Sequence, residues 1–214
     1  MLRSIALCST LIFSLLGCES TYYAAMEKVG VHKRDIMVDR VEEARDAQED
    51  AQEQFKSALE QFQALTNFDG GDLQRMYEAT SDSYESSAES AQDVTQRIDA
   101  VEDVAGALFD EWEDEIDQIS SDRLKRDSRN KLKATQRNYQ DLIRSMRKAE
   151  AKMEPVLVAL KDNMLYLKHN LNAAAIGSLE QEYRVIKSDI DVLISEMNAS
   201  IATSNEFIES LRGT

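Results

Sequence analysis

Two neighbouring segments, residues 72–119 and 122–172, both repeat apolar or small residues at alternating steps of three and four. A seven-residue repeat of this kind keeps one narrow face of a helix turned toward a partner helix. The pattern therefore predicts two long helices that pack along a thin seam. The seam positions are Tyr77, Thr80, Tyr84, Ser87, Ala91, Val94, Ile98, Val101, Ala105, Leu108 and Trp112, and then Leu132, Thr135, Tyr139, Leu142, Met146, Ala149, Met153, Val156 and Leu160.

The two segments carry opposite charges outside their seams. Residues 72–119 hold 15 Asp or Glu against 2 Lys or Arg, and residues 122–172 hold 6 against 13, so the net charges are −13 and +7. We expect the chain to fold back at residues 120–122 and bring these charges together. Exposed pairs contribute ~0.2–1 kcal/mol each, but a row of them selects the antiparallel register. The expected pairs are Glu115 with Arg126, Glu111 with Lys131, Asp103 with Arg137, and Asp93 with Arg147 or Lys148.

Two further helices with the same repeat are predicted before and after this pair. The first runs from about Tyr22 to Leu65, and a Gly-Gly turn follows it, with Asp72 as the N-cap of the next helix. The last opens at Ser178, which forms a capping box with Gln181. Their seams are Met37, Val41, Ala44, Gln48, Ala51, Phe55, Ala58, Phe62 and Leu65, and then Leu179, Tyr183, Ile186, Ile190, Leu193, Met197, Ser200, Ser204, Phe207 and Leu211.

The fold class that follows is all-α: an elongated antiparallel bundle of four long helices over residues 22–214. One Pro and seven Gly among 214 residues suit such a chain. The single proline, Pro155, lies inside the third helix, where we expect a kink because the seam keeps its phase across it. The alternative is a long helical hairpin that completes its bundle by dimerising, so a homo-oligomer stays open.

Residues 1–17 read as a cleaved leader, with Arg3 before a short apolar core that is too short to span a bilayer. The end of this core, Leu15 to Cys18, resembles the lipobox of bacterial lipoproteins. That resemblance implies lipidation of Cys18, with residues 18–21 as a short tether. The membrane is then a partner, because each buried CH₂ of the acyl chains contributes ~0.8 kcal/mol.

A periplasm-facing position follows from the anchor. Glu19 comes directly after Cys18, where the inner-membrane retention signal of such lipoproteins usually has Asp, so the outer membrane is favoured over the inner one. Aromatic and cationic side chains close to the anchor suit the membrane interface, although the tyrosines suit the end of a bundle equally well. The candidate membrane-proximal residues are Tyr22, Tyr23, Lys28, Lys33 and Arg34.

Composition and motifs argue against several functional classes. A formal charge of −15 disfavours nucleic acid, whose phosphates are bound by clustered Lys and Arg. Neither His32 nor His169 has a Glu three residues before it, as a di-iron bundle requires. The acidic run at residues 110–115 has a helical pattern rather than that of a calcium loop. We therefore expect no metal, no cofactor and no catalytic residues.

The turns at residues 66–72 and 173–178 place apolar groups at the end of the bundle far from the anchor. Phe68 and Ile176 are candidate contacts for an envelope partner. The alternative is that they pack back on the last helical turns as part of the caps.

Four stretches of the chain resemble a family of bacterial secreted or lipoprotein sequences that is catalogued only as a domain of unknown function. They are YYAAMEKVGVHKRDI (22–36), NFDGGDL (67–73), DAVEDVAGALFDEWEDE (99–115) and AEAKMEPVLVALKDNMLYLKHNLNAAAIGSL (149–179). The resemblance spans nearly all of the chain after the leader. It implies no activity.

Three functional hypotheses remain. The first is a non-enzymatic lipoprotein that serves as an adaptor or spacer among proteins of the cell envelope. The second is a periplasmic holdase that grips unfolded chains, which an exposed apolar groove would favour. The third is a metal carrier or enzyme without a recognisable motif.

Overall fold

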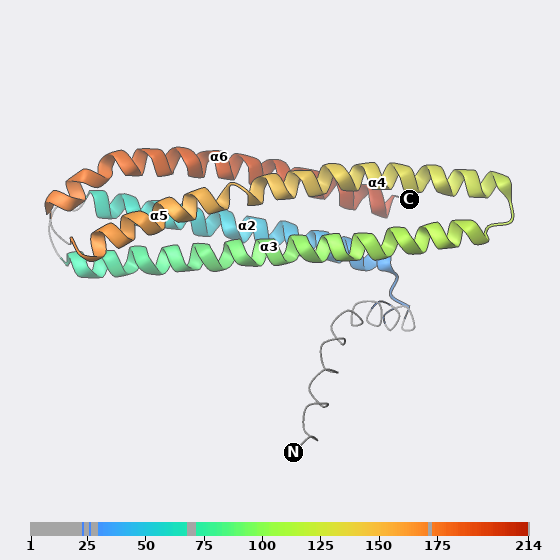
Figure 1. Cartoon of the computed structure of the whole chain (residues 1–214), viewed down its shortest axis with the longest axis horizontal. Coiled ribbons are helices and arrows are strands. Elements are labelled where there is room, and N and C mark those ends of the chain that lie inside the picture. Colours follow the sequence, from blue (N-terminus) through green and yellow to red (C-terminus); the bar gives the residue numbers. More distant parts are fainter. Residues whose placement is uncertain (1–22, 24–25, 27–29, 68–71, 171–172, 214) are drawn as a thin grey trace, which may run out of the picture.

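The computed structural model describes residue 23, residue 26 and residues 30–67, 72–170 and 173–213. Long helices make up these parts of the chain, and no strand occurs among them. The helices are α2 (Lys33–Thr66), α3 (Leu73–Gln118), α4 (Asp122–Glu150), α5 (Met153–Lys168) and α6 (Ala173–Arg212). Because α4 and α5 follow one another in nearly the same direction, the helices form four antiparallel rods, as the sequence predicts (Figure 1).

The rods are arranged around one long core. α2 packs on α3 and α6, and the α4–α5 rod packs between α3 and α6 on the opposite side. α3 has 46 residues, which at ~1.5 Å per residue makes a rod of roughly 70 Å. The predicted seams line this core: every seam residue of the first helix is buried, from Met37 to Leu65. Among the other predicted seam positions only Tyr77, Tyr84, Trp112, Tyr139 and Tyr183 are partly exposed.

The first helix does not run unbroken from Tyr22, as the sequence analysis predicts. Gly30 adopts a φ of +85°, and the backbone N–H of Val31 donates to the carbonyl of Met26 at 3.1 Å. A glycine of this conformation followed by such a bond is the usual C-terminal stop of a helix. The chain then turns through His32 and restarts as α2 at Lys33.

The third predicted helix is interrupted near its proline rather than merely kinked. α4 ends at Glu150, and α5 begins at Met153 after a two-residue turn. Pro155 has no N–H to donate to the carbonyl of Ala151, and Lys152 instead donates to Ala149 in a tighter turn at 3.0 Å. The seam keeps its phase across the interruption, because Met153 and Val156 are both buried.

The helix ends are only partly as predicted. Asp72 does cap α3, accepting a hydrogen bond from the backbone N–H of Arg75 at 3.1 Å. Ser178, in contrast, lies inside α6, which begins five residues earlier at Ala173. A run of three alanines favours the helix strongly enough to include the Gly177 that follows, at a cost of roughly 1 kcal/mol.

The hairpin between α3 and α4 extends beyond the other rods. Lys33, the first residue of α2, forms an ion pair with Glu111, and Leu211 near the end of α6 lines the same cavity as Trp112. Residues 113–130 therefore continue past both α2 and α6 as a two-helix projection, here called the hairpin arm (Figure 1). The C-terminal end of α6 and the start of α2 lie at this same end of the bundle.

Gln48 is the polar residue of the α2 seam, and it is fully buried. Neither its amide nitrogen nor its amide oxygen has a hydrogen-bond partner among the described residues. Burying an unpaired amide costs roughly 1–3 kcal/mol. We expect Gln48→Met, which nearly conserves volume, to raise the free energy of unfolding by about 1–2 kcal/mol in urea titrations.

Gln52 provides a matched control one turn away. Its amide nitrogen donates to the side-chain oxygen of Asn198 at 3.1 Å, so Gln52→Met loses an existing bond and gains no stability. A decrease in stability for Gln48→Met would show that the buried amide is satisfied in solution.

Candidate functional site

Among the residues proposed from the sequence for membrane or partner contact, those that the structure describes lie at the two ends of the bundle. Cys18, Tyr22, Lys28 and Phe68 fall outside the described residues. Tyr23 is described, and its side chain is 9% exposed and belongs to the core cluster. For Tyr23 this position agrees with the alternative in which it packs on the end of the bundle, and contact of either tyrosine with the membrane interface stays a prediction.

Ile176 lies in the first turns of α6 and is 4% exposed. It belongs to the same hydrophobic cluster as the seam residues of the other rods. This burial matches the alternative in which residues at the far end pack on their own helices.

Lys33 and Arg34 lie where α2 begins, beside the base of the hairpin arm. The ammonium of Lys33 is 3.1 Å from a carboxylate oxygen of Glu111. Both residues line a cavity of about 330 Å³, whose walls mix cationic, acidic and apolar groups. The other lining residues are His32, Leu108, Glu111, Trp112, Glu115, Lys131 and Leu211. Contact of Lys33 or Arg34 with lipid head groups stays a prediction.

The hairpin arm is held together by contacts between its two helices. The indole N–H of Trp112 donates to the hydroxyl of Ser128 at 2.9 Å, and Ile116 is buried between the helices. Asp117 lies 3.1 Å from the Lys125 ammonium and 3.2 Å from the Arg129 guanidinium. The hydrogen bond from Lys125 and its positive charge hold the pKa of the Asp117 carboxyl below its ordinary value.

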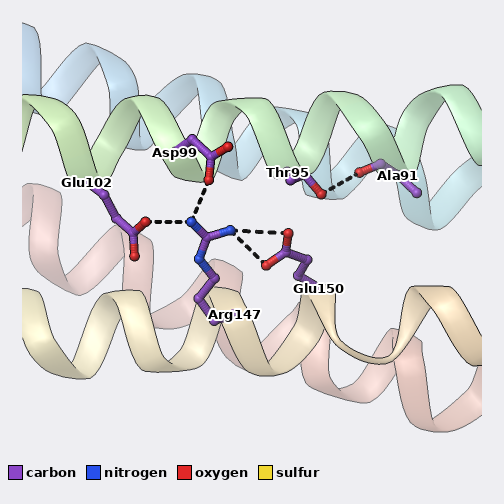
Figure 2. A network of polar contacts seen from close by, with 6 residues as sticks. All are labelled: Ala91, Thr95, Asp99, Glu102, Arg147 and Glu150. Atoms are coloured by element: carbon purple, nitrogen blue, oxygen red, sulfur yellow. Dashed lines mark hydrogen bonds and ion pairs between the residues drawn. The ribbon is translucent and has the colours of Figure 1, made fainter. Parts of the chain in front are cut away.

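Arg147 forms the densest polar network between α3 and α4 (Figure 2). One terminal nitrogen of its guanidinium lies 2.5 Å from Asp99 and 2.5 Å from Glu102, and the other lies 2.9 Å from Glu150. Partial burial alone would lower the pKa of Arg147, but hydrogen bonds to Glu102, Asp99 and Glu150 outweigh this effect and raise it. The guanidinium therefore connects two carboxylates of α3 to one of its own helix.

The ion pairs across this seam differ from the predicted ones. Asp93 pairs with Arg97 of its own helix, Lys148 pairs with Glu196 of α6, and Arg147 reaches carboxylates closer to the turn. The reason is that helical side chains lean toward their own N-terminus. Those of α4 therefore lean toward the turn and those of α3 away from it. Of the other residues in the predicted pairs, Asp103, Arg137, Glu115 and Arg126 take part in none of the ion pairs that the described residues form.

The described residues contain no group of three or more His, Cys, Asp or Glu side chains placed to hold a metal ion. In the same part of the chain, no helix combines the length and apolar character needed to cross a membrane. The groups that cluster instead are ion pairs between rods and apolar side chains along grooves.

Comparison with known protein families gives one match. A model described as "Protein of unknown function (DUF2959)" covers residues 22–211, which is nearly all of the helical part. The chain belongs to the DUF2959 family. No curated protein and no solved structure matches it. This match confirms the resemblance to a family of unknown function, and the DUF2959 domain coincides with the bundle. The leader and the lipidation of Cys18 stay predictions.

The groove between α3 and α5 in this DUF2959 domain was not anticipated from the sequence. It lies beside the interruption between α4 and α5 and is bounded by alanines on the α3 side. Alanines at seam spacing also occur where two helices pack closely, as at Ala44 and Ala51 of α2, so spacing alone does not separate the two cases. The only signal was Pro155, which marks where the rod is interrupted.

The Arg147 network makes a prediction about stability. Arg147→Leu leaves Asp99 and Glu102 facing each other without a cation, and we expect it to lower the free energy of unfolding by about 1–2 kcal/mol. Arg144→Leu is the control, because Arg144 is highly exposed and, among the described residues, its ion-pair partner is Asp141 on its own helix. The loss of stability in this variant is expected to stay below about 0.5 kcal/mol. Equal losses in urea titrations would count against a special role for the network.

Tyr139 makes a prediction about pH. Burial, and secondarily the charge of Glu102, raise the pKa of its hydroxyl from 10.0 to about 12. Its ring meets that of Phe109 edge-on, with centroids 5.4 Å apart. Between pH 10.0 and about pH 12, the Tyr139 hydroxyl loses its proton in the unfolded chain but keeps it in the folded chain. The stability is therefore complete below pH 10.0 and falls as the pH rises toward about 12.

Tyr139→Phe removes this titration. We expect the variant to lose less unfolding free energy than the parent protein between about pH 9 and about pH 11, measured by urea unfolding at both values. Other tyrosines and lysines titrate in both proteins, so their contribution cancels in the difference. Parallel losses in the two proteins would contradict the assignment to Tyr139.

Proposed function

We propose that this DUF2959 protein is a lipid-anchored, periplasm-facing adaptor or spacer of the bacterial cell envelope, attached through Cys18, with the outer membrane favoured. The observation that carries the proposal is the shape of the bundle. Four rods run side by side around a thin core, and the longest reaches roughly 70 Å. Most residues outside the seams are thus presented to solvent along the whole length, as a protein that contacts others along its sides requires.

The arrangement of the ends supports the same proposal. α2, which follows the predicted tether, begins at the end of the bundle where the hairpin arm projects. A chain anchored at Cys18 would hold this end near the membrane and point the α2–α3 and α5–α6 turns away from it. The hairpin arm then faces the membrane side, and the far turns face the periplasmic space.

A holdase is the second candidate, and the groove between α3 and α5 is the observation in its favour. Its lining includes Leu157 and Val158, and its volume is about 620 Å³. A holdase would suppress the aggregation of a denatured client protein at stoichiometric ratios. Failure to do so would leave the adaptor as the better proposal. No contact in the described residues favours a metal carrier or an enzyme.

The anchor can be tested in a bacterial host that has two membranes. We expect globomycin, which blocks lipoprotein leader cleavage, to cause accumulation of a larger precursor, and Cys18→Ala to release the protein from the membrane fraction. Cys8→Ala is the control, because Cys8 lies in the predicted leader, and its membrane attachment is expected to be unchanged. Globomycin-insensitive processing, or membrane attachment of Cys18→Ala, would contradict the anchor.

A further inference from the structure

A groove of about 620 Å³ runs between α3 and the α4–α5 rod, where that rod is interrupted. The α3 wall consists of Tyr84, Ala88, Ala91, Gln92 and Thr95. The facing wall consists of Glu150, Ala151, Met153, Glu154, Leu157, Val158 and Lys161. The floor is apolar, since Ala91, Met153 and Leu157 belong to the core cluster, and Val158 on the outer edge is 46% exposed.

Two parallel rows of side chains define the groove. On α3 the row is Tyr84, Ala88, Ala91 and Thr95, and on the other rod it is Glu150, Glu154, Leu157 and Lys161. Both rows advance by three or four residues. The α3 row is a continuous stripe on one helix, whereas the facing row crosses the interruption, with Glu150 at the end of α4 and the other three residues on α5. The α3 row extends over 11 residue steps, or roughly 16 Å at ~1.5 Å per residue, which is three helical turns. Two such rows with small residues between them form a groove in which a third helix can pack.

The charges around the groove favour a cationic occupant. Glu150 and Glu154 lie in one wall, where Glu150 already pairs with Arg147 of its own rod, and Lys161 is the one cation among the lining residues. The excess of negative charge therefore comes from Glu154 and from the other wall. The other wall belongs to α3, which holds 14 Asp or Glu against 2 Arg. Glu85 and Glu89 of that helix are exposed directly beside Tyr84 and Ala88. The interruption adds an acceptor, because Pro155 cannot donate a hydrogen bond to the carbonyl of Ala151.

We propose that this groove binds an amphipathic helix of a partner protein, with an apolar stripe on the groove floor and Lys or Arg along its flanks. The apolar floor supplies the burial, and the acidic rim selects the charge of the partner. The proposal rests on the adaptor function and names the class of segment that the adaptor receives.

The test uses the full chain in neutral phosphatidylcholine vesicles and a fluorescent helical peptide of about 18 residues, which covers the groove at ~1.5 Å per residue. The peptide has Leu at heptad positions and Lys or Arg on both flanks. Two further peptides serve for comparison: one with Glu on the flanks, and one with the first composition in scrambled order. We expect the cationic amphipathic peptide to bind at least about tenfold more tightly than either. Empty vesicles give the blank.

Two substitutions assign the binding to the groove. Ala88→Phe fills it, and we expect the affinity for the cationic peptide to fall by about fivefold or more. Ala100→Phe is its match on the same helix, outside the groove lining, and leaves the affinity unchanged. Glu154→Gln is expected to weaken binding by about threefold and to reduce its dependence on salt, whereas Glu182→Gln on α6 changes neither. Circular dichroism melting confirms that each variant is folded.

The results separate into two groups. Preference for the cationic amphipathic peptide, lost in folded Ala88→Phe and kept in Ala100→Phe, supports the proposal. Equal binding of the scrambled peptide, or undiminished binding to Ala88→Phe, overturns it. The globomycin and Cys18→Ala results do not depend on the peptide. A protein that is anchored but binds no peptide would therefore disprove the groove proposal and leave the anchored adaptor standing.

Discussion

The burial of one narrow apolar stripe on each helix holds the whole molecule together. No rod has a hydrophobic interior of its own, so each is stable only where its stripe meets the stripes of its neighbours. Seam residues such as Phe55, Phe62, Ile98 and Leu142 have no exposed surface, whereas charged and polar residues are common between the seam positions. The core is therefore as long as the bundle and only one layer of side chains deep. The ion pairs around it, including those of Arg147, set the register of the rods and add little to the burial.

Most of the fold could be predicted from the sequence because the apolar repeat is a local property of each segment. A repeat of three and four identifies the inward face of a helix without knowledge of the partner, and the buried residues from Met37 to Leu65 and from Leu142 to Leu160 match that face. The Asp72 cap could also be predicted, because Asp72 follows a Gly-Gly pair and directly precedes the next stretch with the apolar repeat. The family, too, was recognisable from the sequence.

The features that could not be predicted are of two kinds. Some depend on which of two neighbouring sequence signals prevails, and others depend on contacts between rods. Gly30 ends one helix because it takes a positive φ, yet a single glycine is often accommodated inside a helix, as Gly177 is. The partners of Arg147 depend on the direction in which side chains point along two antiparallel helices. The predicted pairs were obtained by counting residues from the turn, and such counting does not include this direction. The groove depends on how far apart α3 and α5 lie, and alanines at 88 and 91 suit a wide gap and a tight contact equally.

The stop at Gly30 also has a mechanical consequence for a chain held by its N-terminal end. The ring of Tyr23 is docked on the same core that α2 helps to form, so the chain is held against the bundle on both sides of residues 30–32. In the proposed protein anchored at Cys18, a force on the N-terminal end would therefore reach the core through Tyr23 before it reaches the start of α2. Release of that one ring would let the bundle turn about residues 30–32.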